Sequence, residues 1–179
     1  SLIRLVAQFS PRHIVMLISL GAYLLVLPCL NEDLFRDDFY HRAILTGENT
    51  IPGTPAAAPM TLWEASQDLF SFFGADNENL TKGMEAGVVP WWADPHLEIR
   101  FWRPISAVTH WLDYQLWPNS SMLMHLHSAL WYTLLVFAYG YFLREFRFQG
   151  WALLAAMMAY GMDASHIPSI AWVANRNIL

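Results

Sequence analysis

The feature that most constrains this chain is an apolar run near its start, residues 13–30, which contains no Asp, Glu, Lys or Arg. A helix needs about 20 mostly apolar residues to cross a bilayer. The run leads directly into Asn31, Glu32 and Asp33 rather than into small residues of a cleavage site, which favours an uncleaved span over a signal peptide. Residues 124–143 and 148–162 form two further apolar runs, the second of them short for a bilayer.

The composition agrees with a membrane protein and excludes other classes. Hydrophobic residues make up 55% of the chain and charged residues only 14%, against about 25% in soluble domains. A net charge of −5 offers no basic surface for nucleic acid. The single cysteine, Cys29, rules out an internal disulfide and a cysteine-based metal site. We therefore expect an all-α membrane protein with about three transmembrane helices.

The distribution of charge predicts how the spans are oriented. Arg4 and Arg12 precede the first apolar run, and Arg144 and Arg147 separate the second from the third, so the positive-inside rule places both segments in the cytoplasm. Residues 31–121 hold 13 acidic and five basic residues, as expected of an external loop. The expected segments are a cytoplasmic N-terminal segment (1–12), a first span (13–30), an external loop (31–123), a second span (124–143), a cytoplasmic turn (144–147), a third span (148–162), and an external motif with the start of a further helix (163–179).

The external loop is expected to carry short interfacial helices. Thr61 and Glu64 match a capping box that starts a helix over 62–73, and Pro104 precedes an expected helix over 105–116. Residues 49–59 are rich in proline and alanine, and 74–87 are polar, so both are expected to be loops. Tryptophan favours the membrane interface, and the loop has several in its last third (Trp91, Trp92, Trp102, Trp111 and Trp117).

An adjacent acidic pair, Asp37 and Asp38, follows the first span. Ionisable groups at membrane depth are costly, and this pair could serve as a general base or a metal-binding carboxylate. An exposed acidic turn, or ion pairs with Arg36 and Arg42, fits the spacing equally well.

An arginine and a pair of histidines come later in the chain. Arg103, next to the start of an expected helix, is a candidate anion site, although an interfacial arginine paired with Asp94 or Glu98 fits as well. His125 and His127 open the second span, but residues two apart do not share a helical face, so they do not predict a two-ligand metal site. We therefore expect one of them to face a cavity and the other to cap the helix or to lie at the membrane interface.

The last polar stretch follows the third span. Asp163 and His166 are three residues apart, Pro168 opposes a simple continuation of the helix, and Asn175 and Arg176 come where a fourth helix is expected to open. Polar and ionisable groups at this depth favour a functional role.

The combination of these motifs resembles the N-terminal part of the GT-C superfamily of polytopic glycosyltransferases. The branch it resembles is that of the protein O-mannosyltransferases and of the proteins with transmembrane helices followed by tetratricopeptide repeats. The resemblance rests on the acidic pair after the first span, the Arg-Pro helix start, a histidine entering the second span, and a histidine followed by Ala-Trp and Asn-Arg (Asp37-Asp38, Arg103-Pro104, His125, His166, Ala171-Trp172 and Asn175-Arg176). The chain departs from the family pattern at Pro168, where several relatives carry a glutamate, and Asp163 is a candidate to substitute for that carboxylate. The family fold has eight or more spans, which implies a fragment or a reduced relative.

The resemblance implies transfer of a sugar from a polyprenyl-phosphate donor to an acceptor on the outer face of the membrane. Asp38 or its neighbour Asp37 would be the catalytic base. The other motif residues would bind donor phosphate or sugar (Arg103, His125, His166, Asn175 and Arg176). Some members of the superfamily use a divalent metal, with which an acidic pair is compatible. The implied setting is the lipid bilayer of a bacterial inner membrane, with the N-terminus in the cytoplasm.

Two other classes of protein fit the same sequence. A non-catalytic accessory subunit of three helices, packing against other membrane subunits, suits the length and the tryptophan-rich loop. A tetrapyrrole-contacting subunit would use His125, His127 or His166 as an axial ligand.

Overall fold

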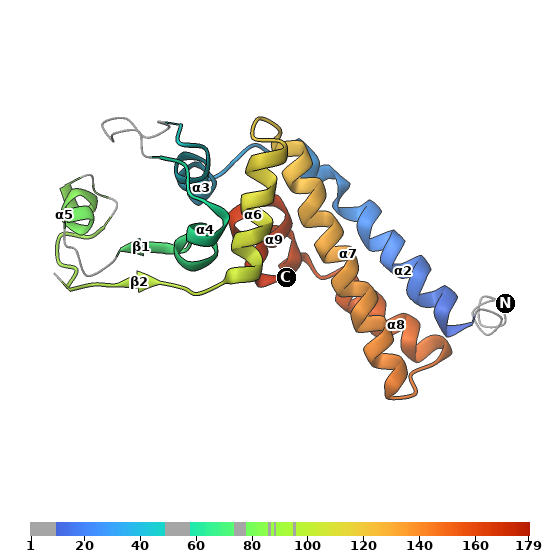
Figure 1. Cartoon of the computed structure of the whole chain (residues 1–179). Helices are drawn as coiled ribbons and strands as arrows, with labels where there is room; N and C mark the ends of the chain where they lie inside the picture. The colour runs from blue at the N-terminus through green and yellow to red at the C-terminus, as the bar shows by residue number, and fades with distance from the viewer. Residues whose placement is uncertain (1–9, 49–57, 74–77, 86, 88, 95) are drawn as a thin grey trace. The chain divides into compact units, whose positions relative to one another are not determined.

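The computed structural model describes residues 10–48, 58–73, 78–85, 87, 89–94 and 96–179. It divides the chain into two compact units: a span unit of residues 1–39 and 117–179, and a loop unit of residues 40–116. Most of the expected cytoplasmic segment, residues 1–9 with Arg4, lies outside the described residues, as does most of the expected 49–59 loop. Both units are mostly helical (Figure 1).

Helix α2 (Pro11–Val26) and the 3₁₀ helix η1 (Leu27–Asn31) form the first apolar segment of the span unit. Ser10 caps α2, since its hydroxyl accepts a hydrogen bond from the His13 N–H, and Pro11 follows at a position where no N–H is needed. The 21 residues from Pro11 to Asn31 are long and apolar enough to cross a membrane.

Helix α7 (Ser121–Glu145) is the second apolar segment. Ser120 caps it by accepting from the Leu123 N–H. Its 25 residues correspond to about 37 Å, which exceeds the hydrocarbon thickness of a bilayer. By length and composition, α7 and the α2–η1 segment are the candidate membrane spans in the described part of the chain.

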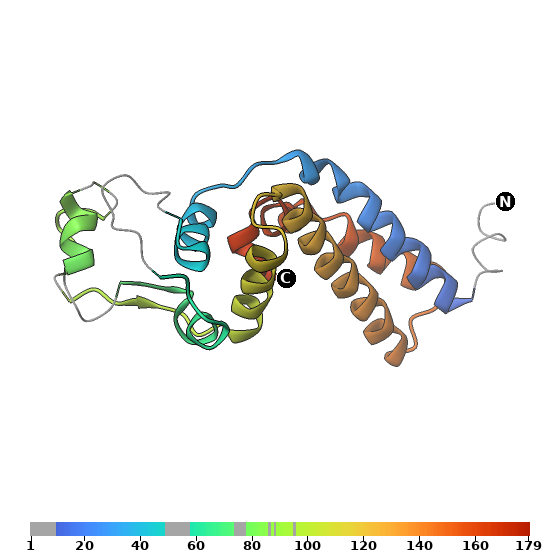
Figure 2. The same ribbon diagram turned by 45° about the horizontal axis from the view of Figure 1, so that its top comes forward.

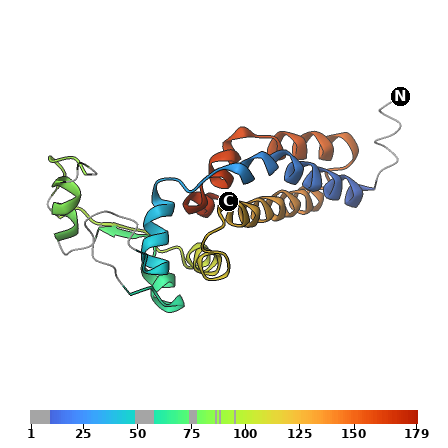
Figure 3. The ribbon, with the colours of Figure 1, turned by 90° about the horizontal axis from the view of Figure 1, so that it is seen from above.

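Helix α8 (Gly150–Gly161) follows a short turn and packs against both α2 and α7, as Figures 2 and 3 show. It has 12 residues, or about 18 Å, so the third expected span is not confirmed as a membrane-crossing helix. In a bilayer, close packing rather than exclusion of water holds helices together. Gly140 on α7 permits that approach, because an added Cβ would lie 2.6 Å from Cε of Met157.

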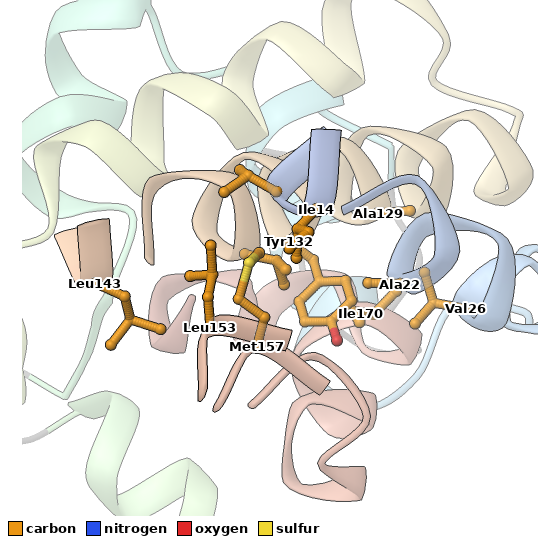
Figure 4. Packing of buried hydrophobic residues seen from close by; sticks show 11 residues of the cluster. Ile14, Ala22, Val26, Ala129, Tyr132, Leu143, Leu153, Met157 and Ile170 are labelled. Atoms are coloured by element: carbon orange, nitrogen blue, oxygen red, sulfur yellow. The ribbon is translucent and has the colours of Figure 1, made fainter. Parts of the chain in front are cut away.

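The apolar core of the span unit comes from all three of these helices and α9 (Figure 4). Its central side chains are fully buried, among them Val15, Tyr132, Leu153 and Met157. The Tyr132 hydroxyl donates a short hydrogen bond to the Gly161 carbonyl at the end of α8. This contact fixes the end of α8 about halfway along α7.

Three short helices replace a regular helix after α8: η2 (Ala164–His166), α9 (Ile167–Ala171) and η3 (Val173–Ile178). Pro168 does not end the helical structure of this segment. It lies in the first turn of α9, where proline is tolerated. The expectation that Arg176 opens a fourth helix is wrong for the described chain. Arg176 lies inside η3, a 3₁₀ helix that begins at Val173.

The loop unit contains most of α3 (Asp37–Thr46), then α4 (Leu62–Asp68), β1 (Ser71–Phe73), α5 (Glu78–Glu85), β2 (Ile99–Arg100) and α6 (Pro104–Leu116). The capping box of Thr61 and Glu64 is confirmed at the start of α4. The expected helix over 62–73 ends at Asp68, because the next residues pair with β2 as an antiparallel strand. The expected loop over 74–87 includes α5.

The centre of the loop unit holds a histidine pair among aromatic rings. His41 of α3 and His110 of α6 are buried, and their ring centroids lie 5.3 Å apart. Phe70 lies edge-on to His41 at 5.0 Å, and Phe72 stacks on it at 6.3 Å. Asp113, one turn after His110, is also fully buried. Polar side chains therefore occupy the interior of this unit.

Candidate functional site

A polar cluster lies in the span unit at the N-terminal end of α7. Three segments far apart in the sequence contribute to it: the first turn of α3, the first two turns of α7, and the stretch from Ile170 to Arg176 in α9 and η3. Figure 1 shows α9 beside this half of α7. The sequence singled out residues in all three segments, and the structure brings them together.

Asp38 joins α3 to the C-terminal segment. One carboxylate oxygen accepts from the Ala174 N–H at 2.6 Å and the other from the Phe35 N–H at 2.9 Å. The residue is fully buried. Burial raises the pKa of Asp38, and these N–H donors together with the nearby His125 oppose that rise. Asp38 is thus a structural acceptor at the centre of the cluster.

Asp37 has a different environment one position earlier. It is half-buried, so part of the side chain is accessible to solvent. Burial raises the pKa of Asp37, and the adjacent Arg36 opposes the rise. A raised pKa makes the ionised carboxylate a better proton acceptor near neutral pH. Of the two adjacent carboxylates, Asp37 is the one that an incoming molecule can reach.

Arg176 is buried against the first two turns of α7, with 4% of its surface exposed. Its Nε donates to the Ser128 hydroxyl at 2.9 Å, and one terminal nitrogen donates to the Met124 carbonyl at 3.0 Å. The other terminal nitrogen lies 3.4 Å from Nδ1 of His127. These contacts hold the guanidinium in one orientation and attach η3 to α7.

The contact between Arg176 and His127 has a chemical consequence. Nε2 of His127 accepts from the indole N–H of Trp131 at 3.0 Å, so the neutral imidazole carries its proton on Nδ1. Nδ1 of His127 and the Arg176 nitrogen then lie side by side at 3.4 Å. An oxygen anion beside the pair, about 2.9 Å from each nitrogen, would accept from both. His127 is half-buried, so this position is not sealed within the core.

His125, the histidine that the sequence selected, points the other way. It is fully buried, and its Nδ1 donates to the Ile170 carbonyl at 2.9 Å. Its Nε2 is also buried and makes no hydrogen bond within the described part of the chain. Sequence reasoning separated the two histidines correctly but could not say which would neighbour the arginine, so His127 and Ser128 were missed as members of the cluster.

The remaining candidates lie in other surroundings. His166 packs between the rings of Tyr132 and Tyr160, with centroids at 5.2 and 4.8 Å. Asp163 caps η2 by accepting from the Ser165 N–H, and this hydrogen bond lowers the pKa of Asp163. Asn175 is half-buried beside Arg176.

Arg103 belongs to the loop unit and is not a member of the cluster. Its guanidinium lies over the rings of Phe101 and Phe70, at 4.5 and 5.3 Å from their centroids. It precedes Pro104, which opens α6 as expected. This stacking is a cation–π arrangement. It does not test the anion site expected at Arg103, which stays a prediction.

Two further findings concern metal binding and similarity to known proteins. Among the residues whose placement is described, no three His, Cys, Asp or Glu side chains gather so as to hold a metal ion. No protein-family model matches the chain, and neither characterised proteins nor solved structures give a significant match. The proposed function is therefore based on the polar cluster.

Proposed function

We propose that this chain forms part or all of a membrane glycosyltransferase of the GT-C type. The reaction moves a sugar from a polyprenyl-phosphate donor to an acceptor hydroxyl on the outer side of the membrane. The observation that carries the proposal is the convergence of three motif segments, those of Asp38, His125 and Asn175-Arg176, at one end of α7. These are three of the motifs on which the resemblance to that superfamily rests.

The proposed reaction assigns different tasks to residues of the cluster and to Asp37 beside it. The acceptor oxygen attacks C1 of the sugar and forms the new glycosidic bond, while the bond from C1 to the phosphate oxygen breaks. Asp37 takes the acceptor proton, a contribution of about 10²–10⁴-fold. Arg176 and His127 donate to the departing phosphate, which leaves with the electron pair of the broken bond. Asp38 holds the first turn of α3 against η3, and Asn175 reads a sugar hydroxyl.

The membrane setting rests on the two long apolar helices. Beyond its first turn, the exposed face of α2 is apolar and includes Met16, Leu20 and Leu24, each more than half exposed. Such a surface suits contact with lipid. We place residues 1–12 in the cytoplasm and the polar cluster at the outer surface, with α8 and the short helices after it completing a third, discontinuous crossing.

Transfer is tested on the purified full-length protein in lipid nanodiscs with radiolabelled polyprenyl-phosphate glucose, mannose or galactose. The acceptors are membrane proteins and short serine- or threonine-containing peptides. We expect Asp37→Asn to lower turnover at least about 100-fold with little change in donor KM. Arg176→Lys should chiefly raise the donor KM, since a single ammonium group cannot hold the Ser128 hydroxyl and the Met124 carbonyl and also donate to the phosphate.

The matched control is Asp33→Asn, which removes an exposed carboxylate from the same stretch. It should leave transfer unchanged. Absence of transfer from every donor, in protein that keeps its fold, would sink the transferase proposal and favour the accessory-subunit alternative. Full activity of Asp37→Asn would remove Asp37 as the base.

A further inference from the structure

A surface hollow of about 390 Å³ lies in the loop unit. It is lined by the end of α4, the start of β1, and β2 with the two residues after it (Gln67, Asp68, Ser71, Arg100, Phe101 and Trp102). Ser71 and Arg100 are partners in the β1–β2 pair, and the Phe101 N–H donates to the Phe70 carbonyl. Backbone pairing therefore fixes the walls of the hollow. Its volume is within the range of small-molecule sites, about 300–1,000 Å³.

The hollow places a positive and a negative charge side by side. One terminal nitrogen of Arg100 lies 3.0 Å from a carboxylate oxygen of Asp68, and Arg100 Nε donates to the Ser71 hydroxyl at 2.8 Å. The two charged side chains are 58% and 48% exposed. An exposed ion pair of this kind contributes little to stability. A ligand can therefore contact both charges, or separate them, at a small cost in free energy.

Two aromatic side chains form the other wall. Trp102 is 72% exposed and Phe101 is 46% exposed. The Phe101 ring already has a cation above it, because the guanidinium of Arg103 lies 4.5 Å from its centroid. The indole face of Trp102 attracts cations more strongly than a phenyl ring. The aromatic wall and Asp68 thus favour a cation, whereas Arg100 and Ser71 favour an anion.

We propose that this hollow binds a zwitterion in which a phosphate and an ammonium group are joined by a short chain, as in phosphoethanolamine and phosphocholine headgroups. The phosphate pairs with Arg100 and the Ser71 hydroxyl. The ammonium group lies between Asp68 and the face of Trp102. The site is independent of the proposed sugar transfer, and its test needs neither donor nor acceptor.

The test uses the full chain in nanodiscs of phosphatidylglycerol, a lipid without an amine, and soluble sn-glycero-3-phosphoethanolamine as the probe. Saturation-transfer NMR measures the affinity. We expect saturable binding of the probe, and binding at least about tenfold weaker for glycerol 3-phosphate and for ethanolamine, which each carry one of the two charges. Equal binding of either single-charge molecule, or displacement of the probe by an uncharged methyl glycoside, would overturn the proposal.

Point variants tie the binding to these residues. Trp102→Ala should weaken the probe about threefold or more, as loss of one exposed cation–π contact predicts. Trp63→Ala is the matched control, because Trp63 is 73% exposed in the same unit but does not line the hollow. Asp68→Asn should weaken the probe while sparing glycerol 3-phosphate. Unchanged binding in both the Trp102 and Asp68 variants would place the ligand elsewhere.

A last arm distinguishes a lipid headgroup from a free zwitterion. Replacing half of the phosphatidylglycerol with phosphatidylethanolamine lowers the signal of the soluble probe if the membrane's own headgroups reach the hollow. An unchanged signal assigns the site to a free zwitterion. Either result supports the site and identifies its source.

Discussion

Acid should destabilise the loop unit, and His41 is the reason. The imidazole is 1% exposed, and neither ring nitrogen makes a hydrogen bond within the described part of the chain. Burial lowers the pKa of His41 from 6.5 to about 3. His110 and Phe70 face it from α6 and the segment before β1, and Tyr40 precedes it on α3. None of these neighbours supplies a negative charge that would favour a protonated ring.

The sign and size of the effect follow from proton linkage. An exposed histidine in the unfolded chain binds its proton near pH 6.5, whereas folded His41 binds it only near pH 3. Between these values the unfolded state holds more protons, so stability is complete above pH 6.5 and declines as the pH falls towards 3. Acidification from pH 7.5 to 4.5 covers two units of that window, a loss of about 2.7 kcal/mol.

Hydrogen exchange is the appropriate assay because it reports on one unit at a time. Protection of the amides in α3 and α6 is measured at pH 7.5 and 4.5 and corrected for intrinsic exchange rates. We expect the opening free energy to fall by about 2–3 kcal/mol. His41→Phe keeps an aromatic ring beside Phe70 and Phe72 and removes two buried polar atoms. It should be more stable at neutral pH by about 1–3 kcal/mol and lose most of the pH dependence.

The comparison variant is His96→Phe, which removes an exposed histidine from the same unit and should retain the pH dependence. Equal protection at both pH values in the natural sequence would refute the reasoning. So would a His41→Phe variant that loses protection in acid as strongly as the natural sequence does.

Further predictions concern packing and caps. Gly140→Ala should lower the free energy of unfolding of the span unit by about 1–3 kcal/mol, measured by thermal unfolding, because the new Cβ overlaps two side chains. In Gly21→Ala, the control, the new Cβ meets nothing within 4 Å, so this variant should be neutral or slightly stabilising. Tyr132→Phe removes a buried hydrogen bond to α8 and should lower stability by about 1 kcal/mol or more in the same assay. Thr61→Ala breaks the capping box with Glu64 and should speed amide exchange across α4, because the helix loses about 0.5–2 kcal/mol of stability. Unchanged exchange would count against the cap.

The features that the sequence predicted well depend on neighbours along the chain. An apolar run without charge predicts α7, a proline at N1 predicts the start of α6, and Thr61 with Glu64 predicts the start of α4. Each rule concerns residues within one or two helical turns. The β1–β2 pair was missed because Ser71 and Arg100 are far apart in sequence, and the strands are only three and two residues long.

The candidate site was predicted as a set of residues but not as a geometry. Adjacent positions on a helix differ by about 100° in direction, so the sequence could not say which of Asp37 and Asp38 is buried. The same limit applied to His125 and His127. Tertiary packing against η3 decides both cases, since Asp38 meets Ala174 and His127 meets Arg176. A pattern of residue types alone contains no information about that packing.

The interruption after α8 explains why polar side chains gather at this end of α7. A continuous helix would satisfy its own backbone groups, but η2, α9 and η3 are too short to do so. Side chains satisfy them instead: Asp38 accepts from the Ala174 N–H, and His125 donates to the Ile170 carbonyl. These two buried motif residues are therefore occupied by the fold itself. In the proposed transferase, chemistry on a substrate would therefore fall to the partly exposed groups beside them, Asp37 and His127. Arg176 would contact the substrate while also holding η3 against α7.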